Sequence, residues 1–380
     1  MRYEDFSDQS PGILVPTVYN AKAFVPNPLP PEIDFADIAL AFAEASARLG
    51  ELKGACRRLT NPYIFIRPLQ RLEAQTSSAM EGTHTTADKL ALAEAGVQTT
   101  TDSQTKEVSN YIRALQEATN SLSDLPITHR TFKAAHKTLL SGVGRERGED
   151  KLPGQFKRDQ NMIGGVTLET ARFIPAPPSH TPDCISALES FINAERDPKL
   201  ALLDIALAHY QFETIHPFAD GNGRVGRMLI SLMAMSKGLL DIPALFVSPS
   251  LEGVKDEYIE RLYRVSAFNE WAEWINFFFE VVGRTATNTV ETIDRIIGLQ
   301  EDYKSRASSV STSSNLLTVV DMLFESPVLR PRDIVERTGL TDAAARTLLS
   351  KLVEIGILTE VSIYPRAWIA VELIRFSSPA

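Results

Sequence analysis

The feature that most constrains the fold is a short glycine-containing segment flanked by two stretches of helical periodicity. Apolar residues recur at i, i+3, i+4 and i+7 before and after it: Leu203, Ala206, Leu207 and Tyr210, then Val225, Met228, Leu229 and Leu232. Pro217 disfavours helical geometry for His216, so the first helix is predicted to end there. The second is predicted to begin between Asn222 and Arg224. Leu200–Arg227 is therefore predicted to be a helix–loop–helix.

The loop has the residue types of an anion site. The glycines of Gly221–Gly223 allow backbone N–H groups to approach a phosphate, and a helix N-terminus favours negative charge. Arg224 and Arg227 add planar donor groups that suit phosphate oxygens. Asp220 is a carboxylate beside this site, which makes chemical sense if Mg²⁺ lies between it and the phosphates. His216 stands at the loop entrance, where a general base could reach an attacking hydroxyl.

Two other interpretations of the segment carry less weight. Gly221, Gly223 and Gly226 spell GxGxxG, but the dinucleotide-binding fingerprint follows a strand inside a βαβ unit. Here a helical pattern precedes the glycines, so that interpretation is rejected. DGNG could also be a plain turn joining two helices, with His216 and the arginines on the surface. The presence of all these residue types within one short segment argues against a plain turn.

The segment HPFADGNGRVGR matches the Fic family motif HxFx(D/E)GNGRxxR at every specified position: His216, Phe218, Asp220, Gly221, Asn222, Gly223, Arg224 and Arg227. The chain resembles this family outside the motif as well. The stretch NPYIFIRPLQRLEAQTSSAMEGT is similar to the N-terminal region of bacterial Fic proteins, and Gln160–Gly164 resembles the family's flap. The tail resembles the winged-helix module of some members, so the resemblance covers most of the chain.

This resemblance implies transfer of AMP from ATP to a Ser, Thr or Tyr hydroxyl of a protein, with Mg²⁺ as cofactor. It implies that His216 deprotonates the target hydroxyl and that Asp220 holds Mg²⁺ between the α- and β-phosphates. The Gly221–Gly223 backbone and Asn222 are expected to cradle the phosphates. The other motif residues have binding or structural roles in the family: Arg224 and Arg227 at the β- and γ-phosphates, and Phe218 in the core beneath the loop.

The resemblance also implies contributors to the nucleotide pocket outside the motif. Four flap residues are expected to line the pocket and to bind the target as an added strand: Asn161, Met162, Ile163 and Gly164. Tyr258 matches a family tyrosine beside the adenine, although the family often has two adjacent tyrosines where this chain has Tyr258–Ile259. The alternative is that Tyr258 packs in a helical core.

A glutamate before the motif predicts regulation. Periodicity indicates a helix over Pro68–Glu81, with Gly82 as its C-terminal cap. A glutamate in the last turn faces the negative end of the helix dipole, so it needs a cation as partner. SSAMEG matches the family's inhibitory pattern (S/T)xxxE(G/N), which implies that Glu81 pairs with Arg227 in space that the γ-phosphate needs. A surface glutamate beside a capping glycine is the alternative.

The whole pattern predicts a mainly α fold, with a helical Fic core, a small β-hairpin flap and a C-terminal winged-helix module. The predicted domains are an N-terminal helical extension with the inhibitory helix (1–105), the catalytic core (106–300), a Ser-rich linker (301–315) and a winged helix-turn-helix (316–380). A long helix followed by a loop is the alternative to the linker. An extended arm is expected over 1–30, and further helices at Phe35–Gly50, Asp88–Ala95, Glu107–Leu122 and Thr131–Leu140.

The pattern of residues 316–380 predicts a helix-turn-helix, but the net charge of this segment is unsuitable for DNA binding. Asp333–Thr338 reads as the first helix, Gly339 as the turn and Thr341 as the N-cap of the second helix, and strands are expected around Val361 and Trp368. Residues 316–380 contain seven Lys and Arg against eight Asp and Glu. Because phosphate contacts supply much of DNA affinity, we expect DNA binding to be absent or weak. The module is expected to pack on the core or on a protein partner.

The net charge of -9 over 380 residues also disfavours nucleic acid as a partner. There is no signal-peptide pattern and no apolar run of the roughly 18 residues that a membrane span needs. Cys56 and Cys184 lack metal-ligand spacing. We therefore expect a cytoplasmic protein without a membrane partner. Its expected substrate is a protein bound along the flap, which can be another copy of this chain. A homodimer is expected because dimers are frequent among relatives. Two functional alternatives are other chemistry at the same site (phosphoryl transfer, other nucleotidyl transfer or AMP removal) and a nucleotide-sensing transcription regulator.

Overall fold

The computed structural model describes residues 1–59, 61–97, 102–145, 148–361 and 365–378. This part of the chain is mostly helical, which confirms the predicted mainly α class. It divides into two compact units, the first formed by Met1–Gly54 and Arg113–Thr287 and the second by Ala55–Ile112 and Asn288–Ala380. The helices α4 (Ser103–Ser121) and α11 (Trp271–Val310) each contribute to both units. The N-terminal extension predicted over 1–105 is thus divided between the two units.

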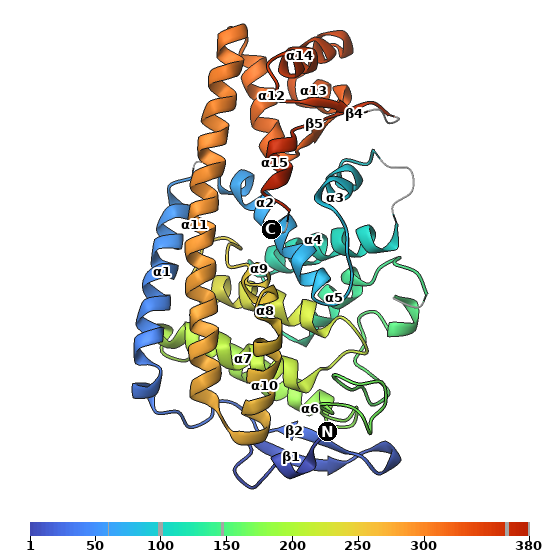
Figure 1. Cartoon of the computed structure of the whole chain (residues 1–380), viewed down its shortest axis with the longest axis vertical. Coiled ribbons are helices and arrows are strands. Elements are labelled where there is room, and N and C mark those ends of the chain that lie inside the picture. The colour runs from blue at the N-terminus through green and yellow to red at the C-terminus, as the bar shows by residue number, and fades with distance from the viewer. Residues whose placement is uncertain (60, 98–101, 146–147, 362–364, 379–380) are drawn as a thin grey trace. The chain divides into compact units, whose positions relative to one another are not determined.

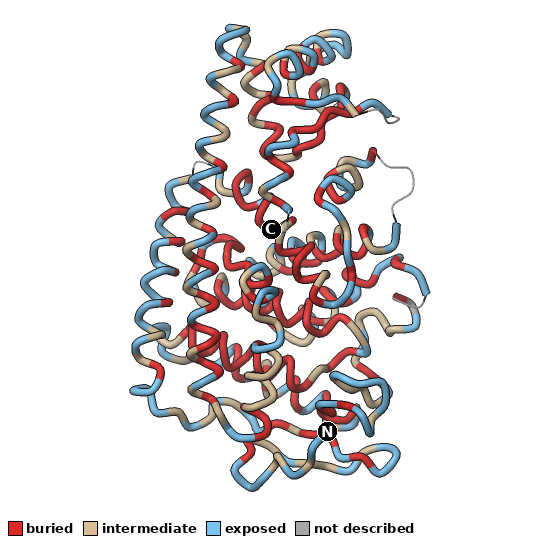
Figure 2. Tube along the Cα trace, viewed as in Figure 1, coloured by how far each residue is buried: buried red, intermediate tan, exposed pale blue. Residues whose placement is uncertain are grey.

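A fully buried helix, α7 (Ala201–Ile215), forms the centre of the first unit (Figure 2). A helix that is buried on every face must be surrounded by other elements, and α7 packs against α6 (Thr181–Asn193), α8 (Asn222–Ser236) and α10 (Lys255–Phe268). The indole N–H of Trp274 in α11 donates to the carbonyl of Ala206 at 3.1 Å. The unit also contains α5 (His129–Leu139), α9 (Ser248–Glu252) and all but the last three residues of α1 (Ala39–Arg57), labelled in Figure 1.

The N-terminal arm is a β-hairpin, which the sequence pattern did not predict. Strands β1 (Gly12–Pro16) and β2 (Lys22–Pro26) pair antiparallel, with Gly12 opposite Pro26. Gly12 is required by packing, because a Cβ atom there would lie 2.5 Å from the ring of Phe24. The hairpin is attached to the flap, since the N–H of Phe24 donates to the carbonyl of Ile174 at 2.9 Å.

The predicted flap hairpin is reduced to one β-bridge, between Ile163 and Phe173. The N–H of Ile163 donates to the carbonyl of Phe173 at 2.9 Å, and the N–H of Arg172 donates to the carbonyl of Gly164 at 2.7 Å. Gly164 and Gly165 then adopt φ angles of 64° and 110°. These angles leave the extended region, so the ladder cannot continue past the bridge. The flap is therefore a looped hairpin without two strands.

The second unit combines α2 and α3 with the C-terminal elements. The helices are α2 (Pro62–Ala79), α3 (Ala87–Glu94), α12 (Ser314–Glu325), α13 (Pro331–Thr338), α14 (Asp342–Glu354) and α15 (Val371–Arg375). Strands β3 (Val328–Leu329), β4 (Thr359–Val361) and β5 (Ala367–Ile369) form an antiparallel sheet in the order β3-β5-β4. The predicted turn and cap are present: Gly339 has φ 71°, and Thr341 accepts from the N–H of Ala344 at 3.3 Å. The winged-helix assignment itself stays a prediction.

The helix expected to precede the inhibitory glutamate belongs to this second unit. Ile64 and Phe65 of α2 join the apolar cluster formed by α12, α13 and α14. The guanidinium of Arg67 donates to the carbonyl of Glu325, the last residue of α12, at 3.0 Å. The amide of Gln75 donates to the carbonyl of Ser377. Contacts along its length therefore fasten α2 to the C-terminal elements.

Several helix boundaries differ from the prediction. The helix expected over Pro68–Glu81 is α2, which begins six residues earlier because Pro62 suits the first helical position, and which ends at Ala79, so Glu81 lies beyond it. α1 continues through Gly50 to Arg57, because two exposed glycines cost less than the burial of Leu52 and Ala55 gains. α11 runs to Val310, so most of the predicted linker is helical, and the buried Tyr303 and Ala307 hold it in the apolar cluster of the second unit. Short 3-10 helices lie at Tyr3–Asp5, Val18–Asn20, Phe35–Asp37, Glu149–Lys151 and Pro198–Leu200. Among the described residues, no helix is both long and apolar enough to cross a membrane.

Candidate active site

The predicted helix–loop–helix is confirmed, and its loop joins α7 to α8. His216 ends α7 in the left-handed conformation, with φ 50° and ψ 60°. Gly221 precedes α8 with φ 77°, a conformation that glycine adopts without steric cost. A non-glycine residue held in the left-handed region stores strain, and such residues concentrate at functional sites. The chain is thus turned sharply at the histidine that the motif marks as catalytic.

The imidazole of His216 has a defined tautomer. Its Nδ1 lies 3.2 Å from the carbonyl oxygen of Glu213, one turn earlier in α7. Because a carbonyl oxygen only accepts, the neutral ring carries its proton on Nδ1 and a lone pair on Nε2. That tautomer is the one a general base needs, and the side chain is half-buried at the loop entrance.

Asn222 uses its side chain to close the loop. Its Oδ1 accepts from the N–H of Phe218 at 2.8 Å, and its Nδ2 donates to the carbonyl of Phe218 at 2.8 Å. Asn222 is 2% exposed and the ring of Phe218 is fully buried. The role expected for Phe218 in the core is consistent with this burial. The amide of Asn222 acts on the loop backbone, so its contribution to a phosphate cradle is to shape the loop.

The charged groups of the motif gather around the start of α8. The N–H of Gly221 donates to Oδ1 of Asp220 at 2.5 Å, and Nη2 of Arg224 lies 3.4 Å from the same oxygen. Arg224 and Arg227 are 1% and 3% exposed. Buried guanidinium groups at a helix N-terminus make a strongly anion-attracting site. Gly223 follows in the first turn of α8 and is buried.

Asn161 links the flap to the motif loop. Its Nδ2 donates to the carbonyls of both His216 and Phe218 at 2.9 Å. Its Oδ1 accepts from Nζ of Lys157 at 2.8 Å, and the same Nζ donates to the carbonyl of Ile215 at 3.2 Å. Burial lowers the pKa of Lys157 to about 7. Sequence reasoning missed Lys157, because an isolated lysine carries no local signal of burial.

The other predicted flap residues lie beside the bridge. Met162 is half-buried and packs against the cluster of Ala21, Ala23, Ala171 and Ile174. Ile163 forms the bridge to Phe173, and Gly164 is exposed. The predicted residues 161–164 thus run from the motif loop, through the bridge, to the exposed turn of the flap.

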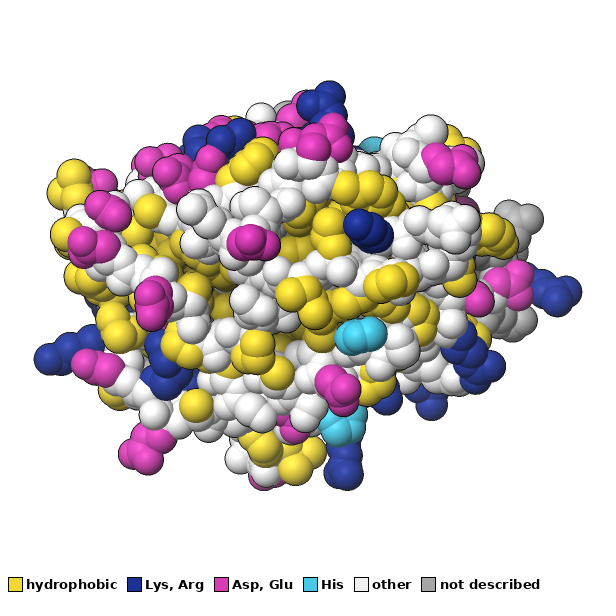
Figure 3. Space-filling view, turned by 90° about the horizontal axis from the view of Figure 1, so that it is seen from below, with side chains coloured by type: hydrophobic (Ala, Val, Ile, Leu, Met, Phe, Trp, Pro, Cys, Tyr) yellow, Lys and Arg dark blue, Asp and Glu magenta, His cyan; other side chains and the backbone are white. Residues whose placement is uncertain are grey.

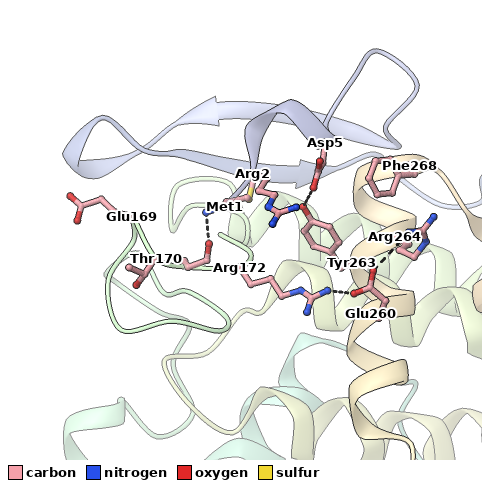
Figure 4. A pocket seen from close by; sticks show the side chains of 11 residues that line it. Met1, Arg2, Asp5, Glu169, Thr170, Arg172, Glu260, Tyr263, Arg264 and Phe268 are labelled. Atoms are coloured by element: carbon pink, nitrogen blue, oxygen red, sulfur yellow. Dashed lines mark hydrogen bonds and ion pairs between the residues drawn. The ribbon is translucent and has the colours of Figure 1, made fainter.

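The far side of the flap is fixed to α10. Arg172 forms an ion pair with Glu260, and its guanidinium lies 5.1 Å from the ring centroid of Tyr263. These side chains line a pocket of about 640 Å³ (Figure 4). The hydroxyl of Tyr263 donates to Asp5 of the N-terminal arm at 2.7 Å. The flap is therefore held at the motif loop on one side and at α10 on the other.

Two buried histidines contact the motif from outside it. Nε2 of His136 lies 3.0 Å from the carbonyl oxygen of Asp220, and Nδ1 of His209 lies 3.0 Å from the carbonyl oxygen of Gly226. Desolvation lowers the pKa of His136 to about 4 and that of His209 to about 3. Both rings are therefore neutral at pH 7. Neither was identified from sequence, since a histidine on an apolar helix face resembles any core residue.

Tyr258 is buried, 5% exposed, and turned toward α7. Its hydroxyl lies 2.9 Å from Nε2 of His209. His209 also contacts the carbonyl of Gly226, which is tightly packed against α7, since a Cβ atom at Gly226 would lie 2.1 Å from Oε1 of Glu213. The surroundings of Tyr258 are those of a residue in a helical core. Its expected contact with adenine stays a prediction.

Glu81 lies in a turn two residues beyond the end of α2 and is exposed. The N–H of Glu81 donates to the carbonyl of Ser78 at 3.0 Å, and the N–H of Gly82 donates to the carbonyl of Ala79 at 2.9 Å. Gly82 has φ 78°, as expected for a C-terminal cap. Glu81 belongs to the second unit and Arg227 to the first.

The fold and this site define a helical protein whose helix–loop–helix carries two buried arginines at the start of a helix. Two family models match the chain: the Fic/DOC family N-terminal model over residues 39–120 and the Fic/DOC family model over residues 126–234. The chain belongs to the Fic/DOC family. The second match contains the motif, the flap and His136.

Relatives with known names extend this finding. The chain is 34% identical over 201 residues to a probable protein adenylyltransferase of Aquifex aeolicus, covering 52% of each chain. It is 32% identical over 115 residues to the protein adenylyltransferase Fic of Drosophila virilis, covering 30% of this chain and 21% of that protein. The chain thus spans between a fifth and about half of the length of these relatives. A Fic family protein from Desulfovibrio desulfuricans has the same fold, with a TM-score of 0.57, 17% identity and coverage of 90% and 98% of the two chains.

Proposed function

We propose that this protein transfers AMP from ATP to a hydroxyl group of a protein and releases pyrophosphate. The observation that carries the proposal is the tautomer of His216, whose Nδ1 is bound to the carbonyl of Glu213. The base is thereby presented beside two buried arginines at the start of α8. The names of the relatives from Aquifex aeolicus and Drosophila virilis support the same activity.

In this mechanism Nε2 of His216 takes the proton of the target hydroxyl as its oxygen attacks the α-phosphorus of ATP. The bond between the α-phosphorus and the α–β bridging oxygen breaks, and pyrophosphate leaves. The Gly221–Gly223 backbone stabilises the charge on the α-phosphate, and Arg224 and Arg227 bind the β- and γ-phosphates. Because the loop is already closed by Asn222, these donors need little rearrangement to act.

Asp220 fits a role in holding Mg²⁺. The described residues contain no group of three or more acidic, histidine or cysteine side chains placed to hold a metal. Mg²⁺ in nucleotide sites, however, is typically held by one or two carboxylates together with phosphates. The carboxylate of Asp220 is 41% exposed and borders the anion site, so it can serve as that ligand. When bound, the ion would neutralise phosphate charge and orient the leaving group.

The surface around the flap suits a protein target. Val166 at the flap tip is 88% exposed, and Val18 and Tyr19 in the hairpin turn are 51% and 88% exposed. Thr17, which precedes them, donates from its hydroxyl to Gln160 of the flap at 2.7 Å. Figure 3, seen from the hairpin side, shows hydrophobic side chains spread over this face. A target lying along the flap would thus meet apolar contacts at the flap tip and the hairpin turn.

Glu81 is proposed to hold this activity in check by pairing with Arg227, in place of the γ-phosphate. The support is its position after α2, at a helix end where a carboxylate lacks favourable interaction with the helix dipole. Because α2 is fastened to the C-terminal elements, those elements are positioned to set how firmly Glu81 is held.

The test is to incubate the Glu81→Gly variant with Mg²⁺ and ATP labelled in either the α- or the γ-phosphate, with a lysate as the source of targets. The proposal expects α-label on protein, an AMP mass increment on Ser, Thr or Tyr, and pyrophosphate as product. Transfer of γ-label would indicate a kinase instead. Removal of AMP from pre-modified protein without forward transfer would indicate the reverse reaction. Either result would overturn the proposal.

A further inference from the structure

A histidine outside the motif is built into the loop that carries the motif's carboxylate. His136 lies in α5 and is fully buried. Its ring stacks on Phe218, with centroids 4.0 Å apart and an interplanar angle of 12°. Both ring nitrogens have backbone partners: Nε2 lies 3.0 Å from the carbonyl oxygen of Asp220, and Nδ1 accepts from the N–H of Gly154 at 2.9 Å.

These two partners determine the proton on the ring. A backbone N–H only donates, so Nδ1 of His136 must carry a lone pair toward Gly154. A carbonyl oxygen only accepts, so Nε2 must carry the hydrogen toward Asp220. The tautomer is therefore the opposite of that in His216, and His136 acts as a hydrogen-bond donor to the loop. Its burial leaves it no path to a substrate hydroxyl.

The peptide unit between Asp220 and Gly221 is held at both of its polar ends. Its carbonyl accepts from His136, and its N–H donates to the carboxylate of Asp220 at 2.5 Å. Rotation of this peptide would break both hydrogen bonds and would move the carboxylate. Gly154, with φ 77°, is packed against α5, where a Cβ atom would lie 3.1 Å from Lys137. The N–H that orients the ring is thus itself fixed.

We propose that His136 is a positioning residue: its Nε2–H fixes the Asp220–Gly221 peptide and so places the Asp220 carboxylate for Mg²⁺ and ATP. The inference rests on the proposed function, because it concerns the same nucleotide site. It predicts that the hydrogen bond to Asp220, rather than the stacking on Phe218 or the bond to Gly154, controls the effect of Mg²⁺ on ATP binding.

A pair of substitutions separates these contacts. In His136→Gln the amide nitrogen can occupy the place of Nε2 and donate to Asp220, but the bond from Gly154 is lost. In His136→Asn the amide oxygen can occupy the place of Nδ1 and accept from Gly154, but the side chain is too short to reach Asp220. Both variants lose the stacking on Phe218. The two therefore differ chiefly in the contact that the proposal invokes.

The experiment measures ATP affinity by calorimetry, with Mg²⁺ and with EDTA, in the full chain carrying Glu81→Gly and His216→Ala so that ATP is not consumed. We expect His136→Gln to keep the gain in affinity that Mg²⁺ gives. His136→Asn should reduce that gain about tenfold, because a buried carbonyl loses its donor. Affinity in EDTA and the melting temperature should be similar in the two variants. His129→Asn, at the half-buried start of the same helix, should behave as the parent.

Equal Mg²⁺ gains in His136→Asn and the parent would overturn the proposal. Equal losses in the Asn and Gln variants would overturn it as well, because they would assign the effect to stacking or packing. A parent that binds no ATP under either condition would instead overturn the proposed function. Long-range ¹H–¹⁵N correlation spectra give a check that does not depend on nucleotide, since they should show the Nε2–H tautomer for His136 in the parent.

Discussion

The motif loop of the first unit carries the proposed general base, His216, and the turn after α2 in the second unit carries the proposed inhibitory residue, Glu81. The two segments are built differently. The loop backbone is tied by side chains from three elements: Asn161, Asn222 and His136. At the end of α2, three buried oxygens have no hydrogen-bond partner among the described residues: Oε1 of Gln75, Oγ1 of Thr76 and Oγ of Ser78.

The difference in hydrogen bonding matches the different roles proposed for the motif loop, which is catalysis, and for the end of α2, which is inhibition. A loop whose backbone is hydrogen-bonded by side chains from three elements resists deformation, which keeps the donors aimed at the transition state. A buried oxygen without a donor costs about 1–3 kcal/mol, so the end of α2 is less stable than a fully bonded helix end. We infer that a change in the second unit can shift Glu81 at lower cost than it can shift His216. The following experiments test that comparison.

The largest effect is expected from His216→Ala in the Glu81→Gly background. Loss of the general base should reduce AMP transfer by about 10²–10⁴-fold, because the hydroxyl must then attack without proton removal. ATP affinity should be little changed, since the loop is held by Asn161 and Asn222. Label transfer and calorimetry measure the two quantities, with His180→Ala as the control. Full transfer activity in His216→Ala would exclude the mechanism.

Replacement of Glu81 should have the next largest effect, in the opposite direction. Glu81→Gly is expected to raise self-labelling over the wild type by between about 5- and 150-fold, the range of typical regulatory couplings. Glu81→Gln should raise self-labelling as well, because the proposed pairing with Arg227 needs the negative charge of the carboxylate. The control is Asp88→Asn, an exposed acid at the start of α3. Equal self-labelling by wild type and Glu81→Gly would show that Glu81 does not inhibit.

A weaker activation is expected when α2 is loosened from α3 and α12 within the second unit. Arg71 is 6% exposed, its Nε lies 2.6 Å from Glu94, and its Nη2 donates to the carbonyl of Glu325 at 3.4 Å. Arg71→Ala should raise self-labelling about fivefold, as substitutions that alter coupling without touching ligand do. Arg48→Ala, from an exposed pair on α1, is the control. No change in labelling, in a protein that remains folded, would indicate that α2 does not transmit control.

The burial of Lys157 can be tested through the pH dependence of the free energy of unfolding. Its pKa is lowered by burial from 10.5 to about 7, so between these values the unfolded chain holds a proton that the folded chain has lost. Stability should therefore rise with pH in this window, by up to about 1.4 kcal/mol per pH unit. Denaturant unfolding of wild type and Lys157→Met from pH 7 to 10 measures the difference, and the variant should show a shallower rise. Parallel curves would contradict a neutral, buried lysine.

The smallest effect concerns DNA. Most cations of the C-terminal elements already form ion pairs: Arg330 with Asp333, Arg337 with Glu325, Arg346 with Asp342, and Arg366 with Glu360. Because phosphates would have to displace these carboxylates, we expect no sequence-specific binding in a selection from random duplexes at physiological salt. Enrichment of a defined sequence at nanomolar affinity would contradict this and favour the transcription-regulator alternative.

The sequence by itself determined the elements whose signals are local. The end of α7 at His216, the start of α8 at Asn222, and the turn at Gly339 follow from a proline, a helical period and a glycine, all read within a few residues. The identity of the motif residues follows in the same way, because the chemistry of a phosphate site needs a fixed set of residue types in a fixed order.

Only the tertiary structure decided which distant residues complete the site. His136 is 84 residues from Asp220, and Gly154 joins them through a bond to the same ring. The hairpin β1–β2 depends on the flap for part of its packing, and α2 is fastened to residues more than 250 positions later. Such contacts are set by burial and hydrogen bonding between distant segments. A local period cannot encode them, because the same histidine or glutamine would read as an ordinary core or surface residue in another fold.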